Sequence, residues 1–153
     1  MHHHYTNVQI EKIVNGFRDG TLPVQEWTHE AHLIVGLWYL NNYELDEAIC
    51  RFRPSLINYF SDQGGQHTLS SGYHETLTLF WLEALHSFHE HHTIKGLPFI
   101  KQVERLLSGP IGDKKLPHKF YSSEHLMSIA ARARWVEPDL KKINFKRVLE
   151  ENI

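Results

Sequence analysis

Apolar residues recur at helical spacing near the start of the chain. The first run consists of four apolar residues that lie three or four positions apart: Ile10, Ile13, Val14 and Phe17. This spacing places them on one face of a helix. Thr6 and Gln9 stand at the spacing of a capping box, and Gly20 suits a helix end. The pattern therefore predicts a first helix over about 7–18.

Two later stretches are apolar over most of their surface and predict central helices. The first covers about 29–41 and follows Thr28, which is a good N-cap residue. The second begins near Gly72 or Tyr73 and reaches about His91. A helix that is apolar nearly all round is buried on most sides, so both helices are expected at the centre of the fold.

The remaining elements are shorter or interrupted. A helix is predicted over about 44–61, with a kink or restart at Pro54, and another over about 98–108. Residues 109–121 have the composition of a loop. After this loop, Ser122 or Ser123 can cap a helix that reaches about Arg134, and Asn144 can cap a short terminal helix.

No stretch has the alternating pattern of a strand, so the sequence predicts an all-α protein. We expect an irregular bundle of about five to six helices that forms a single domain over 6–153. Residues 1–5 contain three consecutive histidines, His2, His3 and His4, and are interpreted as a disordered or tag-like start.

Composition and charge exclude several classes of protein. The net charge is −2, and Lys and Arg are dispersed, which does not favour a nucleic-acid partner. A single cysteine, Cys50, rules out an intramolecular disulfide and suits a reducing compartment. No apolar run approaches the roughly 18 residues of a membrane span, and the N-terminus has no apolar core of a signal peptide. We therefore expect a cytoplasmic protein without a membrane partner.

Two histidine-containing segments stand at the starts of the two central helices. His29 and His32 are three residues apart, so they share a helix face, and that face continues as an apolar stripe toward Leu40. His74 heads a similar apolar stripe that continues through Trp81. All three imidazoles are therefore expected to point into the protein.

Topology predicts that these segments meet. Short connections make consecutive helices antiparallel, so the two central helices run parallel and their N-termini lie at the same end. The helix over about 44–61 ends there, and the loop after it crosses the same end. Eight residues are therefore predicted to converge: His29, His32, Asn58, Tyr59, His67, Tyr73, His74 and Glu75.

Such a constellation could support two kinds of chemistry. His29, His32 and His74 could bind one divalent transition metal, zinc, iron, nickel or copper, with an open coordination position. Without a metal, the two helix N-termini could bind an anionic small molecule, and the same field would keep the imidazoles neutral and able to act as bases.

The sequence leaves three functions open. In the first, the protein is a small-molecule enzyme with His29, His74, Glu75 and Tyr73 as catalytic residues. Four further residues would then contact the ligand: Trp27, Asn58, Tyr59 and His67. In the second, the same residues form a non-catalytic module that binds a metal or an anionic ligand. In the third, the histidines are structural and the abundant aromatic side chains form a protein-interaction surface.

Four segments also resemble a family of small, uncharacterised bacterial proteins. They are Trp27-Thr28-His29-x-x-His32-Leu33, Gly72-Tyr73-His74-Glu75-Thr76, Phe120-Tyr121-Ser122 and Trp135-Val136-Glu137-Pro138-Asp139-Leu140. The resemblance spans most of the chain. It implies a whole bacterial protein rather than a fragment, and it implies no activity.

Overall fold

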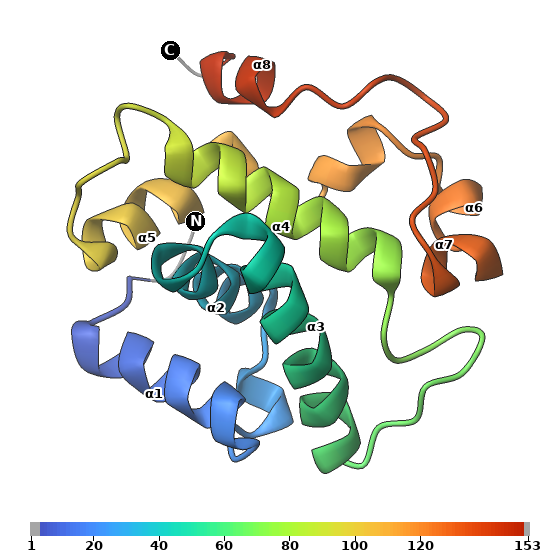
Figure 1. Ribbon diagram of the computed structural model, residues 1–153, viewed down its shortest axis with the longest axis horizontal. Coiled ribbons are helices and arrows are strands. Elements are labelled where there is room, and N and C mark those ends of the chain that lie inside the picture. Colours follow the sequence, from blue (N-terminus) through green and yellow to red (C-terminus); the bar gives the residue numbers. More distant parts are fainter. Residues whose placement is uncertain (1–3, 152–153) are drawn as a thin grey trace.

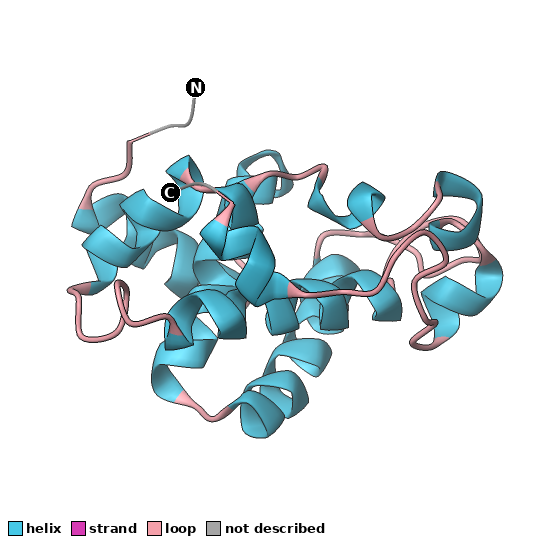
Figure 2. Ribbon diagram, turned by 90° about the horizontal axis from the view of Figure 1, so that it is seen from above, coloured by secondary structure: helices cyan, strands magenta, loops and turns pink. Residues whose placement is uncertain are grey.

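The computed structural model describes residues 4–151, and this part of the chain forms eight α-helices and no strand. The longer helices are α1 (Asn7–Asp19), α2 (His29–Asn42), α3 (Leu45–Asp62), α4 (Glu75–Glu90) and α5 (Phe99–Ser108). The shorter helices are α6 (Ser123–Leu126), α7 (Ile129–Ala133) and α8 (Phe145–Glu150), and the 3-10 turns are Val24–Glu26, Pro110–Gly112 and Leu116–Lys119. The predicted all-α class is therefore confirmed (Figure 2).

Helices α2 and α4 form the centre of the fold, as their apolar sequences predict. In Figure 1, α4 crosses the middle of the molecule and α2 lies beside it. Gly36 lets the two helices approach closely, because a Cβ atom at this position would lie only 2.6 Å from Cδ1 of Leu85. One turn or more toward the N-termini, the ring of His29 meets the ring of Trp81. The order of these contacts shows that α2 and α4 run in the same direction.

The remaining helices cover the central pair from two sides. On one side, α1 and α3 pack through stacked rings, with the centroids of Phe17 and Phe52 5.7 Å apart. On the other side, the 3-10 turn at Pro110–Gly112 contacts α4, α5 and α8. Helices α7 and α8 also contact α4, and α5 contacts α2 (Figure 1). Each central helix thus contacts helices from both the earlier and the later part of the chain.

Local capping explains where the helices differ from the predicted ones. The helix predicted from Ser122 or Ser123 to Arg134 is two helices, because the Ser128 hydroxyl accepts a hydrogen bond from Ala131 N and starts α7 anew. Helix α3 continues through Pro54 and does not restart there. Helix α4 begins at Glu75, a little later than predicted, because His74 serves as its N-cap residue.

The described part of the predicted tag-like start packs against the fold. Residues 1–3 lie outside the described residues. Tyr5 packs against the hydrophobic core, and its hydroxyl donates a hydrogen bond of 3.0 Å to the Glu30 carboxylate. None of the helices in residues 4–151 has the length and hydropathy needed to cross a membrane.

Candidate functional site

A small cleft separates the first turns of α2 and α4. It has a volume of about 270 Å³ and is open to solvent. Eleven residues line it: Trp27, Thr28, His29, His32, Leu56, Phe60, Gly72, His74, Leu77, Thr78 and Trp81. We call it the histidine cleft. The parallel central helices thus bring His29, His32 and His74 to one place, together with Trp27.

His32 is the one imidazole of the cleft without a hydrogen bond from any described residue. It lies in the first turn of α2. The centroid of its ring is 5.6 Å from that of Trp27 and 5.7 Å from that of Phe52. Burial, and to a smaller extent the nearby His29, lower the pKa of His32 to about 4. The ring is therefore neutral at pH 7, with one N–H donor and one acceptor nitrogen available.

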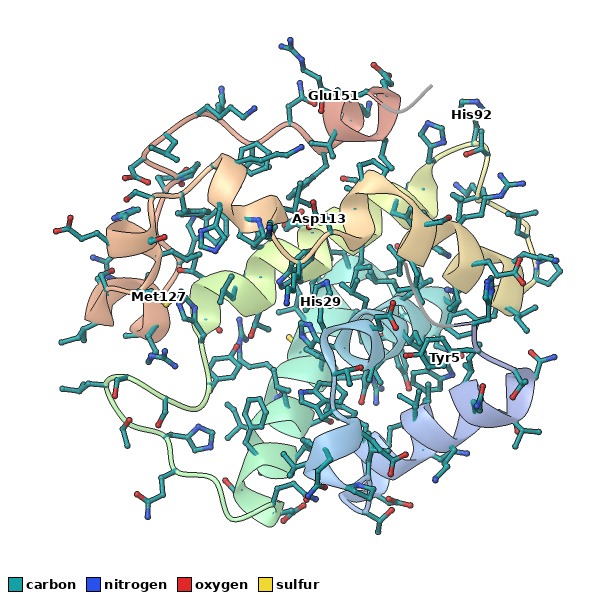
Figure 3. All side chains as sticks on the ribbon, turned by 180° about the vertical axis from the view of Figure 1, so that it is seen from behind. Tyr5, His29, His92, Asp113, Met127 and Glu151 are labelled. Atoms are coloured by element: carbon teal, nitrogen blue, oxygen red, sulfur yellow. The ribbon has the colours of Figure 1, made fainter. Side chains whose placement is uncertain are left out.

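His29 has one ring nitrogen held by the protein and one left over. Its Nε2 donates a hydrogen bond of 3.0 Å to the backbone carbonyl of Gly112, which fixes the tautomer with a lone pair on Nδ1. Figure 3 places His29 beside the segment that carries Asp113. Burial lowers the pKa of His29, so this ring is also neutral at pH 7.

Both ring nitrogens of His74 are engaged inside the protein. Nδ1 accepts a hydrogen bond of 3.1 Å from Leu77 N and so caps α4, while Nε2 donates one of 2.8 Å to the carbonyl of Leu126. Burial lowers the pKa of His74, which agrees with the neutral form that these two bonds require. His74 borders the cleft, but it has no free nitrogen to offer a ligand.

The three histidines do not assemble as a metal-ligand set. Across residues 4–151, no three or more His, Cys, Asp or Glu side chains lie in an arrangement that could hold a metal ion. The physical reason is visible in His74, which would have to give up the bonds to Leu77 and Leu126 to coordinate. Zinc, iron, nickel or copper at this place stays a prediction of the sequence.

Glu75 and Tyr73 face away from the cleft, toward α3. The Glu75 carboxylate accepts two hydrogen bonds from Arg53, of 3.0 Å and 2.8 Å, and the Tyr73 hydroxyl donates a third. Burial, followed by Glu75, raises the pKa of Tyr73 to about 12. This trio joins the start of α4 to α3. Sequence reasoning missed Arg53 because no local pattern pairs residues 22 positions apart.

The other predicted contact residues also lie outside the cleft. Asn58 is exposed on α3. Tyr59 is buried, and its hydroxyl donates a hydrogen bond of 2.8 Å to the carbonyl of Leu22. His67 accepts a hydrogen bond from Tyr73 N and contacts the Ser61 hydroxyl, so it ties down the loop before α4. Of the eight residues predicted to converge, the three inward-facing histidines line the cleft, and Trp27, predicted as a ligand contact, lines it as well.

The hydroxyl groups in the cleft wall are used for helix structure. Thr28 accepts a hydrogen bond from Ala31 N as the N-cap of α2, and Thr78 donates one to the carbonyl of His74. The aromatic and aliphatic side chains supply the rest of the wall. The side-chain polar groups of the cleft wall without a hydrogen bond to a described residue are therefore the two ring nitrogens of His32, Nδ1 of His29 and the indole N–H groups of Trp27 and Trp81.

Comparisons with protein-family models, with curated proteins and with solved structures gave no match to this chain. The histidine cleft therefore has to be interpreted from its own geometry.

Proposed function

We propose that the histidine cleft binds a small, neutral, mainly apolar molecule, and that His32 supplies the hydrogen bond that selects it. The observation that carries this proposal is the half-buried imidazole of His32, which lines the cleft and has no hydrogen bond to any described residue. A ligand group that hydrogen-bonds to such an imidazole typically gains about 0.5–1.5 kcal/mol net of the water it displaces. An imidazole in that state at the wall of a cleft is well suited to a ligand.

The size of the cleft favours a molecule with one or two rings. An apolar cavity of about 150 Å³ is large enough for benzene, and the histidine cleft has about 270 Å³. Trp27 and Trp81 offer aromatic surface, and Phe60 and Leu77 extend it. Flat aromatic ligands gain from such walls through offset or edge-to-face contacts.

The charge of the cleft favours a neutral ligand. Of the described residues that line it, none is Lys, Arg, Asp or Glu. His29, His32 and His74 all have lowered pKa values, so they carry no charge at pH 7. A charged group in this place would lose hydration without gaining a counter-ion, which is costly.

Phenol and toluene test the proposal, since they differ only in a hydroxyl and a methyl group. We expect phenol to bind wild-type protein about tenfold more tightly than toluene, which corresponds to one hydrogen bond of about 1.4 kcal/mol. In His32→Phe the preference for phenol should disappear. Ligand-observed NMR titration measures both affinities.

The matched control is His118→Phe, which makes the same change at an exposed histidine outside the cleft. It should keep the tenfold preference. Equal affinities of phenol and toluene for wild-type protein, or an unchanged preference in His32→Phe, would contradict the proposal.

A catalytic role is a second candidate, and the fixed tautomer of His29 favours it. A backbone carbonyl holds Nε2, so the lone pair on Nδ1 is presented in one orientation, as in a general base. Because the pKa of His29 is lowered, this lone pair stays unprotonated at pH values at which an ordinary histidine would already bind a proton. The predicted enzymatic function would then rest on His29 rather than on His74, Glu75 or Tyr73.

Hydrolysis of p-nitrophenyl acetate, a neutral aromatic ester, tests this second candidate. We expect His29→Gln to lose most of the activity above buffer, while binding of phenol persists. The acid limb of the wild-type pH–rate profile should lie below pH 6.5, because the pKa of His29 is lowered. Binding of phenol without ester turnover would leave the cleft as a binding site only.

A further inference from the structure

The charges of the chain are distributed unevenly along its length. Residues 1–113 contain thirteen Asp and Glu against seven Lys and Arg, whereas residues 114–153 contain nine Lys and Arg against five Asp and Glu. The small net charge of −2 therefore combines an acidic part, residues 1–113, with a basic part, residues 114–153. A charge asymmetry of this kind points to an anionic partner for the basic part.

Among the described residues, the cations of the basic part form no ion pairs. Throughout the described residues, every ion pair lies between Lys12 and Glu104, and none of the nine Lys and Arg after residue 113 is within 4.0 Å of a carboxylate. The acidic part, in contrast, contains five pairs of a Lys or Arg with a carboxylate. The positive field of the basic part is thus left for solvent or a partner.

Four of these cations line one groove. The basic groove has a volume of about 610 Å³ and is lined by Lys119, Phe120, Lys141, Lys142, Ile143, Asn144, Arg147, Val148 and Glu151. Its cations come from the 3-10 turn Leu116–Lys119, from the connection before α8 and from α8 itself. Sequence reasoning counted Lys and Arg as dispersed because the fold, not the sequence, brings these segments together (Figure 1).

The groove also has an apolar wall. Phe120 and Val148 are buried members of the hydrophobic core that reach the groove, and Ile143 is half-buried beside them. The Lys141 ammonium lies 5.3 Å from the centroid of the Phe120 ring. Glu151 is the one carboxylate among the lining residues. A ligand in this groove would therefore meet several positive charges next to an apolar surface.

We propose that the basic groove binds a small organic molecule whose phosphate groups carry at least two negative charges. Three lysines and one arginine suit a ligand with several negative charges better than a ligand with a single carboxylate. Lysine binds phosphate as a point charge. The volume lies within the range of about 300–1,000 Å³ that is typical of small-molecule sites, which favours a small ligand over a polymer. The groove shares no lining residue with the histidine cleft.

Titration calorimetry with ADP, pyrophosphate and adenosine tests this proposal. We expect ADP and pyrophosphate to bind wild-type protein and adenosine not to bind. Raising the salt to about 0.15 M shortens the screening length to about 8 Å and should weaken both affinities. In the double variant Lys141→Ala, Lys142→Ala, the dissociation constant for ADP should rise about tenfold or more.

The matched control is the double variant Lys115→Ala, Lys146→Ala, which removes the same charge from two exposed lysines outside the groove. It should bind ADP nearly as well as wild-type protein, as should His32→Phe. Equal losses in both double variants would show a general charge effect and overturn the proposal. Tighter binding of a single-stranded oligonucleotide or an anionic vesicle than of ADP would also overturn it, because the site would then serve a polymer or a surface.

Discussion

Acidification from about pH 7 to about pH 4 is expected to lower the free energy of unfolding by several kcal/mol, and His32 alone should account for about 3 kcal/mol. The folded protein lowers the pKa of His32 to about 4 by burial, whereas an unfolded chain has a histidine pKa near 6.5. Between these two values the unfolded state binds a proton that the folded state does not. Stability is therefore complete above pH 6.5 and declines as the pH falls toward 4.

Three other histidines should add to this decline. The pKa values of His29, His74 and His89 are all lowered, in each case chiefly by burial, so each also favours the unfolded state once the pH falls below 6.5. The reference pKa values of Asp and Glu are about 3.9 and 4.3, so the range from about pH 6.5 to about pH 5 separates the histidine effect from general acid denaturation.

The variant His32→Phe isolates the contribution of one residue. Its stability should fall less steeply between pH 6.5 and 4, by up to about 1.4 kcal/mol per pH unit. At neutral pH it should be at least as stable as wild-type protein, because it removes an imidazole without a hydrogen-bond partner. Urea denaturation at a series of pH values measures both effects. Parallel stability curves for His32→Phe and wild-type protein would contradict the lowered pKa of His32 in the folded state.

The second large effect is expected for His74→Ala, which should lower the free energy of unfolding by about 2–4 kcal/mol. The cap bond to Leu77 N is worth about 1 kcal/mol. Loss of the imidazole also leaves the carbonyl of Leu126 without its donor, which costs about 1–3 kcal/mol if water does not replace it. His74 is nearly buried, at 8% exposure, so replacement by water is hindered.

His74→Asn separates the two bonds. Asparagine is a good N-cap residue but too short to reach Leu126, so it should recover about 1 kcal/mol of the loss and no more. Guanidinium denaturation of the two variants gives the comparison. Neither variant should lose the preference for phenol completely, because His74 has no free nitrogen in the cleft. A neutral effect of His74→Ala on stability would contradict the structural role and return His74 to the list of candidate ligands.

Local sequence signals predicted the parts of the fold that depend on neighbouring residues. The Thr6–Gln9 capping box, the Thr28 cap and the Asn144 cap all stand where the pattern predicts them. The meeting of His29 and His32 with His74 also followed from the sequence, because short connections make alternate helices parallel. The prediction also placed Asn58, Tyr59 and His67 in the site, but they do not line the cleft. A position at the end of the bundle does not by itself decide which way a side chain points.

Long-range partners could not be predicted from the sequence. The carbonyl that binds His74 belongs to Leu126, 52 residues away, and the one that binds His29 belongs to Gly112, 83 residues away. Both carbonyls lie at the ends of short helical turns, Pro110–Gly112 and α6, that are too short for a periodic pattern to identify. Without knowledge of these partners, the sequence cannot distinguish an imidazole with free nitrogens from one whose nitrogens are both hydrogen-bonded. His32 could therefore not be distinguished from His74 as the residue available to a ligand.

These two long-range bonds tie both rims of the histidine cleft to the later part of the chain. His29 on α2 holds the turn at Pro110–Gly112, and His74 holds the end of α6. A ligand that stabilises the first turns of α2 and α4 would thereby also reduce local unfolding of residues 110–126. Conversely, loosening that distant stretch would let both imidazoles rotate, so occupancy of the cleft and cohesion of the C-terminal third are thermodynamically coupled.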